Sequence, residues 1–138
     1  MIMKHNILIT LVTTAIMVLF SIQDTKAQKL MNSSRSIIGY IEDGSVRSSS
    51  RSTIGYFEDK KVMNSSRSII GYFEDGKIMG SNRSILGYYE NGRVMGSSRS
   101  IRGYVEDGKV LDSSRSIIGY YEGILPSQAA MYFFFFFN

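Results

Sequence analysis

One ten-residue motif, Ser-x-Arg-Ser-x-x-Gly-Tyr-x-Glu, occurs six times in this chain at a constant spacing of 16 residues. A short, fixed period is typical of a small structural unit that packs against copies of itself. The repeat therefore constrains the architecture strongly and the chemistry weakly, because an active site needs one asymmetric cluster of different groups. Its period is marked by six tyrosines: Tyr40, Tyr56, Tyr72, Tyr88, Tyr104 and Tyr120.

Each unit reads as a β-hairpin. Asp-Gly or Asn-Gly, as in Asp75-Gly76 and Asn91-Gly92, separates a long apolar run from a short one. These dipeptides favour the type I′ turn, which needs positive φ at both central residues. The flanking Ile, Val, Tyr and Phe are strand formers, and no helical periodicity is present. The long arm is Arg-Ser-Ile-Ile-Gly-Tyr-x-Glu and the short arm is Lys-Val-Met, in units that begin at Lys29, Ser45, Lys61, Lys77, Arg93 and Lys109.

The long arm is apolar on both faces. Simple alternation in the third unit places Ile69 and Phe73 on one face, with Gly71 between them, and Ile70 and Tyr72 on the other. A strand of this kind needs cover on both sides. Glycine at the same place in every copy indicates a point where backbones crowd or the strand bends: Gly39, Gly55, Gly71, Gly87, Gly103 and Gly119.

These features predict an all-β, quasi-symmetric ring of antiparallel hairpins. An isolated hairpin is unstable in water, and closing the hairpins into a ring removes their exposed edges. Five long-arm/short-arm hairpins are continuous in the chain. A sixth forms if Lys29-Leu30-Met31 pairs with the last long arm, Arg115 to Glu122.

The C-terminal segment 126–138 departs from the repeat. Pro126 ends the pattern, Gln128-Ala129-Ala130 is suited to a helical turn, and five consecutive phenylalanines follow from Phe133 to Phe137. An exposed run of this kind promotes aggregation. We expect it to be a buried strand or plug in the middle of the ring. The alternative, a sorting or membrane-docking signal, is disfavoured because the segment lacks the apolar–polar alternation of a membrane-spanning strand.

The N-terminus has the pattern of a secretory signal. Lys4 and His5 precede an apolar run from Ile7 to Phe20, which is short for a transmembrane helix. Small residues at Thr25 and Ala27 predict cleavage after Ala27, so that 1–27 is the signal peptide and 28–138 is a single domain. An uncleaved membrane anchor is the alternative. Export to the periplasm, the cell surface or the medium is expected, with no transmembrane segment after cleavage.

The composition excludes several kinds of site. The chain has no cysteine, and its only histidine is His5, so most nucleophile–base pairs and transition-metal sites are excluded. The formal net charge is +4, but the charges alternate along the repeats and form no basic run of the kind that marks nucleic-acid binding. We therefore expect no catalytic residues, no metal, no cofactor and no nucleic-acid partner.

The hairpin unit Ile-Gly-Tyr-x-Glu-Asp-Gly-Lys-Val-Met, the secretory start and the ending Glu122-Gly123-Ile124, Ala129-Ala130 and Phe133 to Phe136 resemble the bacterial β-flower proteins. In that family, whose best-known variety is five-fold, hairpins are arranged like petals about an axis. The resemblance spans 28–138 and implies an all-β, quasi-symmetric fold. It supplies no catalytic residues, because the family has no established activity. The chain has six copies of the long arm, whereas the best-known variety of the family is five-fold. The sequence therefore allows either five or six petals.

Two sets of repeated side chains are candidate ligand-facing groups. Six arginines and six glutamates form circles in a closed ring; we expect each Arg to pair with a Glu of its own or the next hairpin. The circle of Tyr40, Tyr56, Tyr72, Tyr88, Tyr104 and Tyr120 is either part of the core or a stacking platform for sugars. Arg102 replaces an apolar residue, which exposes one more face of its hairpin or provides a ligand contact. The copies also differ at Arg47, Thr53 and Lys60.

The function expected from the sequence is that of an exported, non-enzymatic structural or interaction protein whose partner is unknown. The alternative is a module that binds carbohydrate, such as a cell-envelope glycan, through the Tyr or the Arg and Glu circles. An envelope protein is the other class of partner that the sequence leaves open.

Overall fold

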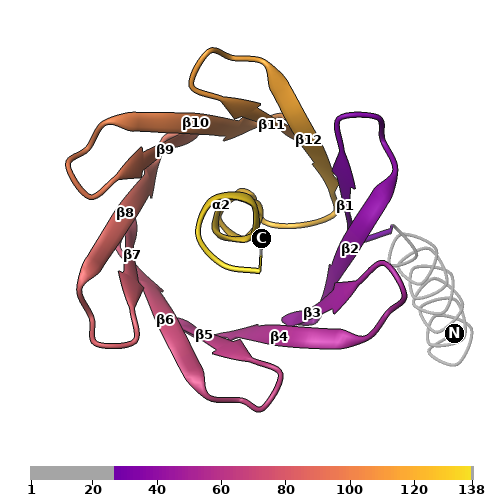
Figure 1. Cartoon of the computed structure of the whole chain (residues 1–138), viewed down its shortest axis with the longest axis horizontal. Coiled ribbons are helices and arrows are strands. Elements are labelled where there is room, and N and C mark those ends of the chain that lie inside the picture. The colour runs from indigo at the N-terminus through magenta and orange to yellow at the C-terminus, as the bar shows by residue number, and fades with distance from the viewer. Residues whose placement is uncertain (1–26, 138) are drawn as a thin grey trace, which may run out of the picture.

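The computed structural model describes residues 27–137 and forms a closed antiparallel barrel of twelve strands around a central helix (Figure 1). The signal peptide predicted over 1–27 lies, except for Ala27, outside the described residues. Four-residue and six-residue strands alternate: β1 Lys29–Asn32, β2 Ile37–Glu42, β3 Ser45–Ser48, β4 Thr53–Glu58, β5 Lys61–Asn64, β6 Ile69–Glu74, β7 Lys77–Gly80, β8 Ile85–Glu90, β9 Arg93–Gly96, β10 Ile101–Glu106, β11 Lys109–Asp112 and β12 Ile117–Glu122.

The predicted ring of hairpins is confirmed, and it contains six petals. Here a petal is a short strand and the long strand that follows it, joined by an outer loop that projects from the ring (Figure 1). Ring closure follows the predicted pairing, since β1 lies antiparallel to β12 with Lys29 opposite Glu122 and Met31 opposite Tyr120. The Lys29 Nζ and Glu122 Oε2 atoms lie 3.5 Å apart at this junction.

The Asp-Gly turns that connect petals adopt the expected left-handed conformation. Asp75 has φ of 51° and Gly76 has φ of 78°, as a type I′ turn requires. In the second unit Lys60 replaces the glycine, and there only Asp59, with φ of 55°, is left-handed. Lys60 does not adopt the positive φ that glycine has at this position in other turns, so the turn between β4 and β5 has a different backbone conformation.

A β-bulge in each long strand makes the simple alternation of faces wrong. Val62 lies opposite Gly71 and Met63 lies opposite Ile69, so Ile70 is an extra residue in the pairing. Ile70 consequently packs against the core cluster, whereas Tyr72 does not belong to that cluster. A bulge bends the strand and redirects the side chain beside it, and nothing in the local composition marks its position.

Each short strand provides one side chain to the core cluster inside the ring. The second residue of every short strand is 0–1% exposed: Leu30, Val46, Val62, Ile78, Val94 and Val110. The repeated glycines of the long strands lie opposite these residues, as Gly71 does opposite Val62. A Cβ added to Gly71 would be 2.6 Å from the Met79 carbonyl oxygen. The predicted crowding of backbones at these glycines is therefore confirmed.

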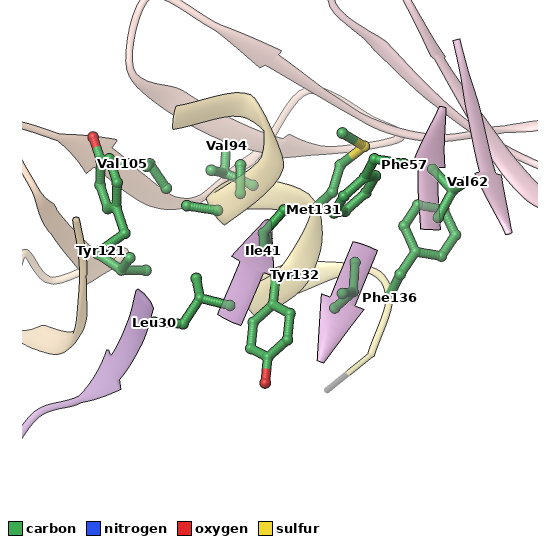
Figure 2. Close-up of a cluster of buried hydrophobic side chains, with 14 of the residues drawn as sticks. Leu30, Ile41, Phe57, Val62, Val94, Val105, Tyr121, Met131, Tyr132 and Phe136 are labelled. Atoms are coloured by element: carbon green, nitrogen blue, oxygen red, sulfur yellow. The ribbon is translucent and has the colours of Figure 1, made fainter. Parts of the chain in front are cut away.

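The C-terminal segment fills the centre of the ring, as the plug prediction required. The expected helical turn at Gln128-Ala129-Ala130 is part of a longer helix, and the alternative of a buried strand is wrong. Helix α2, Pro126–Phe134, begins with proline in its first turn, where the missing N–H has no partner to lose. Ala129 and Ala130 are fully buried, and Met131, Tyr132 and Phe136 are nearly so. Figure 2 shows Met131, Tyr132 and Phe136 among side chains from the surrounding strands.

Candidate functional site

The six repeated tyrosines lie on the outer side of the ring, in the grooves between petals. They alternate along their strands with residues that pack against the plug, such as Ile41, and they are not part of the core cluster. An arginine from the next outer loop stacks over each ring. For Arg51 the guanidinium carbon lies 4.0 Å from the centroid of the Tyr40 ring. The six pairs are Arg35–Tyr120, Arg51–Tyr40, Arg67–Tyr56, Arg83–Tyr72, Arg99–Tyr88 and Arg115–Tyr104.

Five of these arginines also reach a glutamate on the strand that carries their tyrosine. Arg51 and Arg67 each donate a hydrogen bond of 2.9 Å, to Glu42 and Glu58 respectively. Arg83, Arg99 and Arg115 are within 3.4–3.9 Å of the corresponding glutamate oxygens. Five of the grooves thus carry a Tyr–Arg–Glu group that links two petals, whereas at the β12–β1 junction Glu122 lies 3.5 Å from Lys29. Exposed ion pairs of this kind contribute about 0.2–1 kcal/mol.

The arginines hold an unusual backbone conformation. All six have φ between 65° and 68°, a region that non-glycine residues occupy at a cost of roughly 1–2 kcal/mol. Stacking on tyrosine at an exposed site returns about 0.5–1 kcal/mol. Stacking and the ion pair together return about 0.7–2 kcal/mol, which is comparable with the strain. The left-handed residue also closes the outer loop, where the Arg35 N–H donates a hydrogen bond of 3.0 Å to the Asn32 carbonyl.

The stacked arginines limit what the tyrosine circle offers a ligand. One face of each ring is covered by a guanidinium. Five of the six tyrosines are half-buried and Tyr88 is only 8% exposed, so little of the circle is open to a ligand. Shallow clefts of about 260, 250 and 340 Å³ occur in three of these grooves. The first contains Tyr120, Arg35 and Glu122, and the second contains Arg83 and Glu74.

Arg102 lies away from the tyrosine circle. Its guanidinium is 4.9 Å from the centroid of the Phe135 ring and 5.9 Å from that of Phe134. The side chain is exposed and covers the aromatic plug. It occupies the bulge position that Ile38, Ile54 and Ile70 fill in other petals, and those side chains also pack against the core.

The second unit holds the other irregular residues. Arg47 stands where the remaining short strands have buried Met or Leu, and its Nε atom is buried without a hydrogen-bond partner. Thr53 is the first residue of β4 and lies opposite Arg47. Lys60 donates a hydrogen bond of 3.1 Å to Glu74 of the next petal. Sequence reasoning identified these positions as deviations but gave no contact for them.

The Lys60–Glu74 contact leads to a prediction about ionisation. The hydrogen bond from Lys60, followed by the Lys60 charge, lowers the pKa of the Glu74 carboxyl, and Lys77 is the weakest contributor. We expect Lys60→Ala to move the Glu74 pKa back up towards its ordinary value, and Lys77→Ala to change it less. Carbon-detected NMR titration of the side-chain carboxyl measures both. Because the lowered pKa belongs to the folded state, the associated stabilisation is present above the unfolded-state pKa and is lost as the pH falls.

Two further properties concern residues 27–137 alone. Within them no group of three or more His, Cys, Asp and Glu side chains is placed to hold a metal ion. In that same range no helix has the length and apolar character needed to cross a membrane.

The fold and the grooves define a ring of repeated hairpins around an aromatic plug, and in this ring paired polar side chains link neighbouring petals. Comparison with protein families gives a match over residues 27–138 to the family described as 5-fold beta-flower protein. The chain belongs to this family. Membership indicates a small structural protein, and the fold of the family is not a known enzyme class. No curated protein and no solved structure matched the chain.

Proposed function

We propose that this protein is an exported, non-enzymatic scaffold that displays six copies of one outer loop to a repetitive partner of the cell envelope. The observation that carries the proposal is the arrangement of the outer loops around one ring (Figure 1). Four consecutive residues of every loop are exposed: 33–36, 49–52, 65–68, 81–84, 97–100 and 113–116. Serine hydroxyls and an arginine backbone segment are thereby presented six times in the same geometry.

The outer loops are pre-organised for binding. In the first loop the Asn32 carboxamide oxygen accepts hydrogen bonds of 3.0 Å from the Ser34 and Ser36 N–H groups. The Asn32 N–H donates to the Ser36 carbonyl at 2.9 Å. A loop that is already ordered loses little conformational entropy when it binds.

Six equal loops favour a partner with repeated groups. When several weak contacts form on one polymer, the overall affinity exceeds that of a single contact by factors of about 10²–10⁴. Cell-envelope polysaccharides offer repeated hydroxyl and charged groups at short intervals, and they suit the serine and arginine side chains of the loops.

The scaffold proposal predicts a steep dependence on the number of intact loops. Arg→Gly at three tips, Arg51, Arg83 and Arg115, removes guanidinium groups where the backbone already suits glycine. We expect at least about a 10-fold loss of binding to isolated cell-wall polysaccharide, with the far-UV circular dichroism unchanged. The control is Lys61, Lys77 and Lys109→Gln, which removes the same charge from short strands. Equal binding by both triple variants and the wild type contradicts the proposal.

The proposed export of the protein is tested separately, by the position at which the signal peptide is cleaved. The leader pattern of 1–27 predicts that protein recovered outside the cytoplasm begins at Gln28. Intact-mass spectrometry of the secreted or periplasmic protein tests this, and a mass that includes 1–27 contradicts cleavage.

A second candidate function is binding of short glycans within the grooves rather than along the loops. The clefts beside Tyr120, Arg35 and Glu122 favour it, because they combine an aromatic edge with donors and acceptors. On a glycan array, a variant with Tyr72, Tyr104 and Tyr120→Phe keeps the stacked rings of the three grooves that have clefts and removes their hydroxyls. Loss of a glycan signal in this variant supports groove binding, whereas loss only in the loop variant supports the scaffold.

A further inference from the structure

The aromatic tail contacts the ring in a regular order, with one aromatic ring for each petal. The contact point in every petal is the repeated glycine of the long strand. A Cβ built on Gly103 would lie 2.5 Å from Phe134 Cζ, and one built on Gly87 would lie 2.6 Å from Phe135 Cζ. The six contacts are Tyr132–Gly39, Phe133–Gly119, Phe134–Gly103, Phe135–Gly87, Phe136–Gly71 and Phe137–Gly55.

The order is sequential in both partners. Each step of one residue along the tail moves the contact by one petal in a constant direction, from β2 to β12 and then back along the chain to β4. Six consecutive aromatic residues therefore complete one full circle of six petals. Tyr132 acts as the sixth ring beside the five phenylalanines.

The backbone of the tail unwinds after the first three contacts, which residues of helix α2 make. An α-helix turns about 100° per residue, whereas six equal petals are separated by about 60°. Helix α2 ends at Phe134, and the N–H groups of Phe135 and Phe136 both bond to the Met131 carbonyl, at 3.2 and 2.7 Å. The bond between residues five apart widens the last turn, and Figure 1 shows the chain leaving the helix in a wider arc.

We propose that the aromatic run sets the number of petals, because closure at six places each consecutive ring on one glycine. Too few rings leave a glycine uncovered, and too many leave a ring without a contact point. The repeat count and the length of the aromatic run are thus coupled quantities. The same coupling predicts that a five-petal member of the family carries five consecutive aromatic residues.

The coupling is tested by a cycle of four chains. One variant lacks residues 61–76, a complete unit that includes Gly71; another lacks one phenylalanine; a third lacks both; and the fourth is the wild type. The five phenylalanines are identical, so deleting any of them gives the same sequence. Circular dichroism melting and analytical ultracentrifugation compare stability and association state.

The proposal predicts that the phenylalanine deletion lowers the melting temperature of the six-petal chain but raises that of the five-petal chain, by about 5 °C or more. As the control, Phe135→Ala in the five-petal chain removes a ring without shortening the run, and we expect no rescue. A five-petal chain that the phenylalanine deletion does not stabilise, or that Phe135→Ala stabilises equally, overturns the proposal.

A second measurement does not depend on the shortened ring. In the six-petal chain that lacks one phenylalanine, sequential contacts leave only Gly55 without a ring. We expect the ring-current shift of the Gly55 Hα protons to disappear in NMR spectra, while those of Gly71, Gly87, Gly103 and Gly119 persist. Equal changes at all six glycines show that the tail only fills space, and they overturn the proposal.

Discussion

Gly87→Ala is expected to destabilise this protein by about 1–3 kcal/mol or more, because an added methyl group overpacks an already filled site. The new Cβ would meet the Phe135 ring at 2.6 Å, and it would also collide with the Met95 carbonyl oxygen. The carbonyl belongs to the strand backbone and cannot move without disturbing the sheet. Chemical denaturation monitored by circular dichroism gives the change in the free energy of unfolding.

Gly96→Ala is the matched control, since Gly96 lies directly opposite Gly87 in the β8–β9 pair. A Cβ there would have its nearest neighbour, Ser100 Oγ, at 3.6 Å. Other units already carry Asn, Ser or Asp at this position. We expect no loss, or a gain of about 0.4–1 kcal/mol from reduced flexibility of the unfolded chain. Equal effects of the two substitutions would refute the role given to the long-strand glycines.

Deletion of 126–138 is expected to have the largest effect of all. It removes Ala129, Ala130, Met131, Tyr132 and Phe136 from the core and exposes the aliphatic side chains of the short strands. Truncating one large buried side chain costs about 2–5 kcal/mol, and a domain of this size is stable by only about 5–15 kcal/mol. The truncated ring should therefore unfold or associate, as size-exclusion chromatography and thermal melting will detect.

Point variants separate the loss of the plug from a general effect of altering the C-terminus. Met131→Ala changes a residue that is 3% exposed, whereas Leu125→Ala changes one that is 62% exposed just before the helix. The first should lower stability by about 2–5 kcal/mol and the second by much less. A soluble truncation that melts at the wild-type temperature would disprove the plug.

Much of the fold follows from the repeat because the determining interactions are local. Asp-Gly between Phe73 and Lys77 specifies a turn, and strand-forming residues on both sides specify the hairpin. Closure between Lys29 and Glu122 followed from the need to pair the last free edges. The plug followed from the Phe run, and a helical turn was expected at Gln128-Ala129-Ala130. The extension of the helix to Phe134 was not expected, since tertiary packing decides the structure of so short a segment.

The features that sequence reasoning missed depend on contacts between units. The bulge at Ile70 has no composition that marks it. The stacking of Arg51 on Tyr40 requires a left-handed arginine, which the residue type does not suggest. The pairing of one aromatic residue with each petal could have been predicted from the sequence by counting. The chain has six repeated glycines and six consecutive aromatic residues from Tyr132 to Phe137.

The pairing of β1 with β12 also bears on the order of folding. Every other strand pair joins neighbours in the chain, so contact formation is local and fast. Among the described strand pairs, only the β1–β12 junction brings together segments some ninety residues apart, and loop-closure entropy opposes that step about as (3/2)RT ln n. Because the helical plug follows β12 after only a few residues, closing the circle and filling its centre become one late event. Until the C-terminus is available, the petals remain an open ribbon with two free edges, and those edges are vulnerable to pairing with another chain.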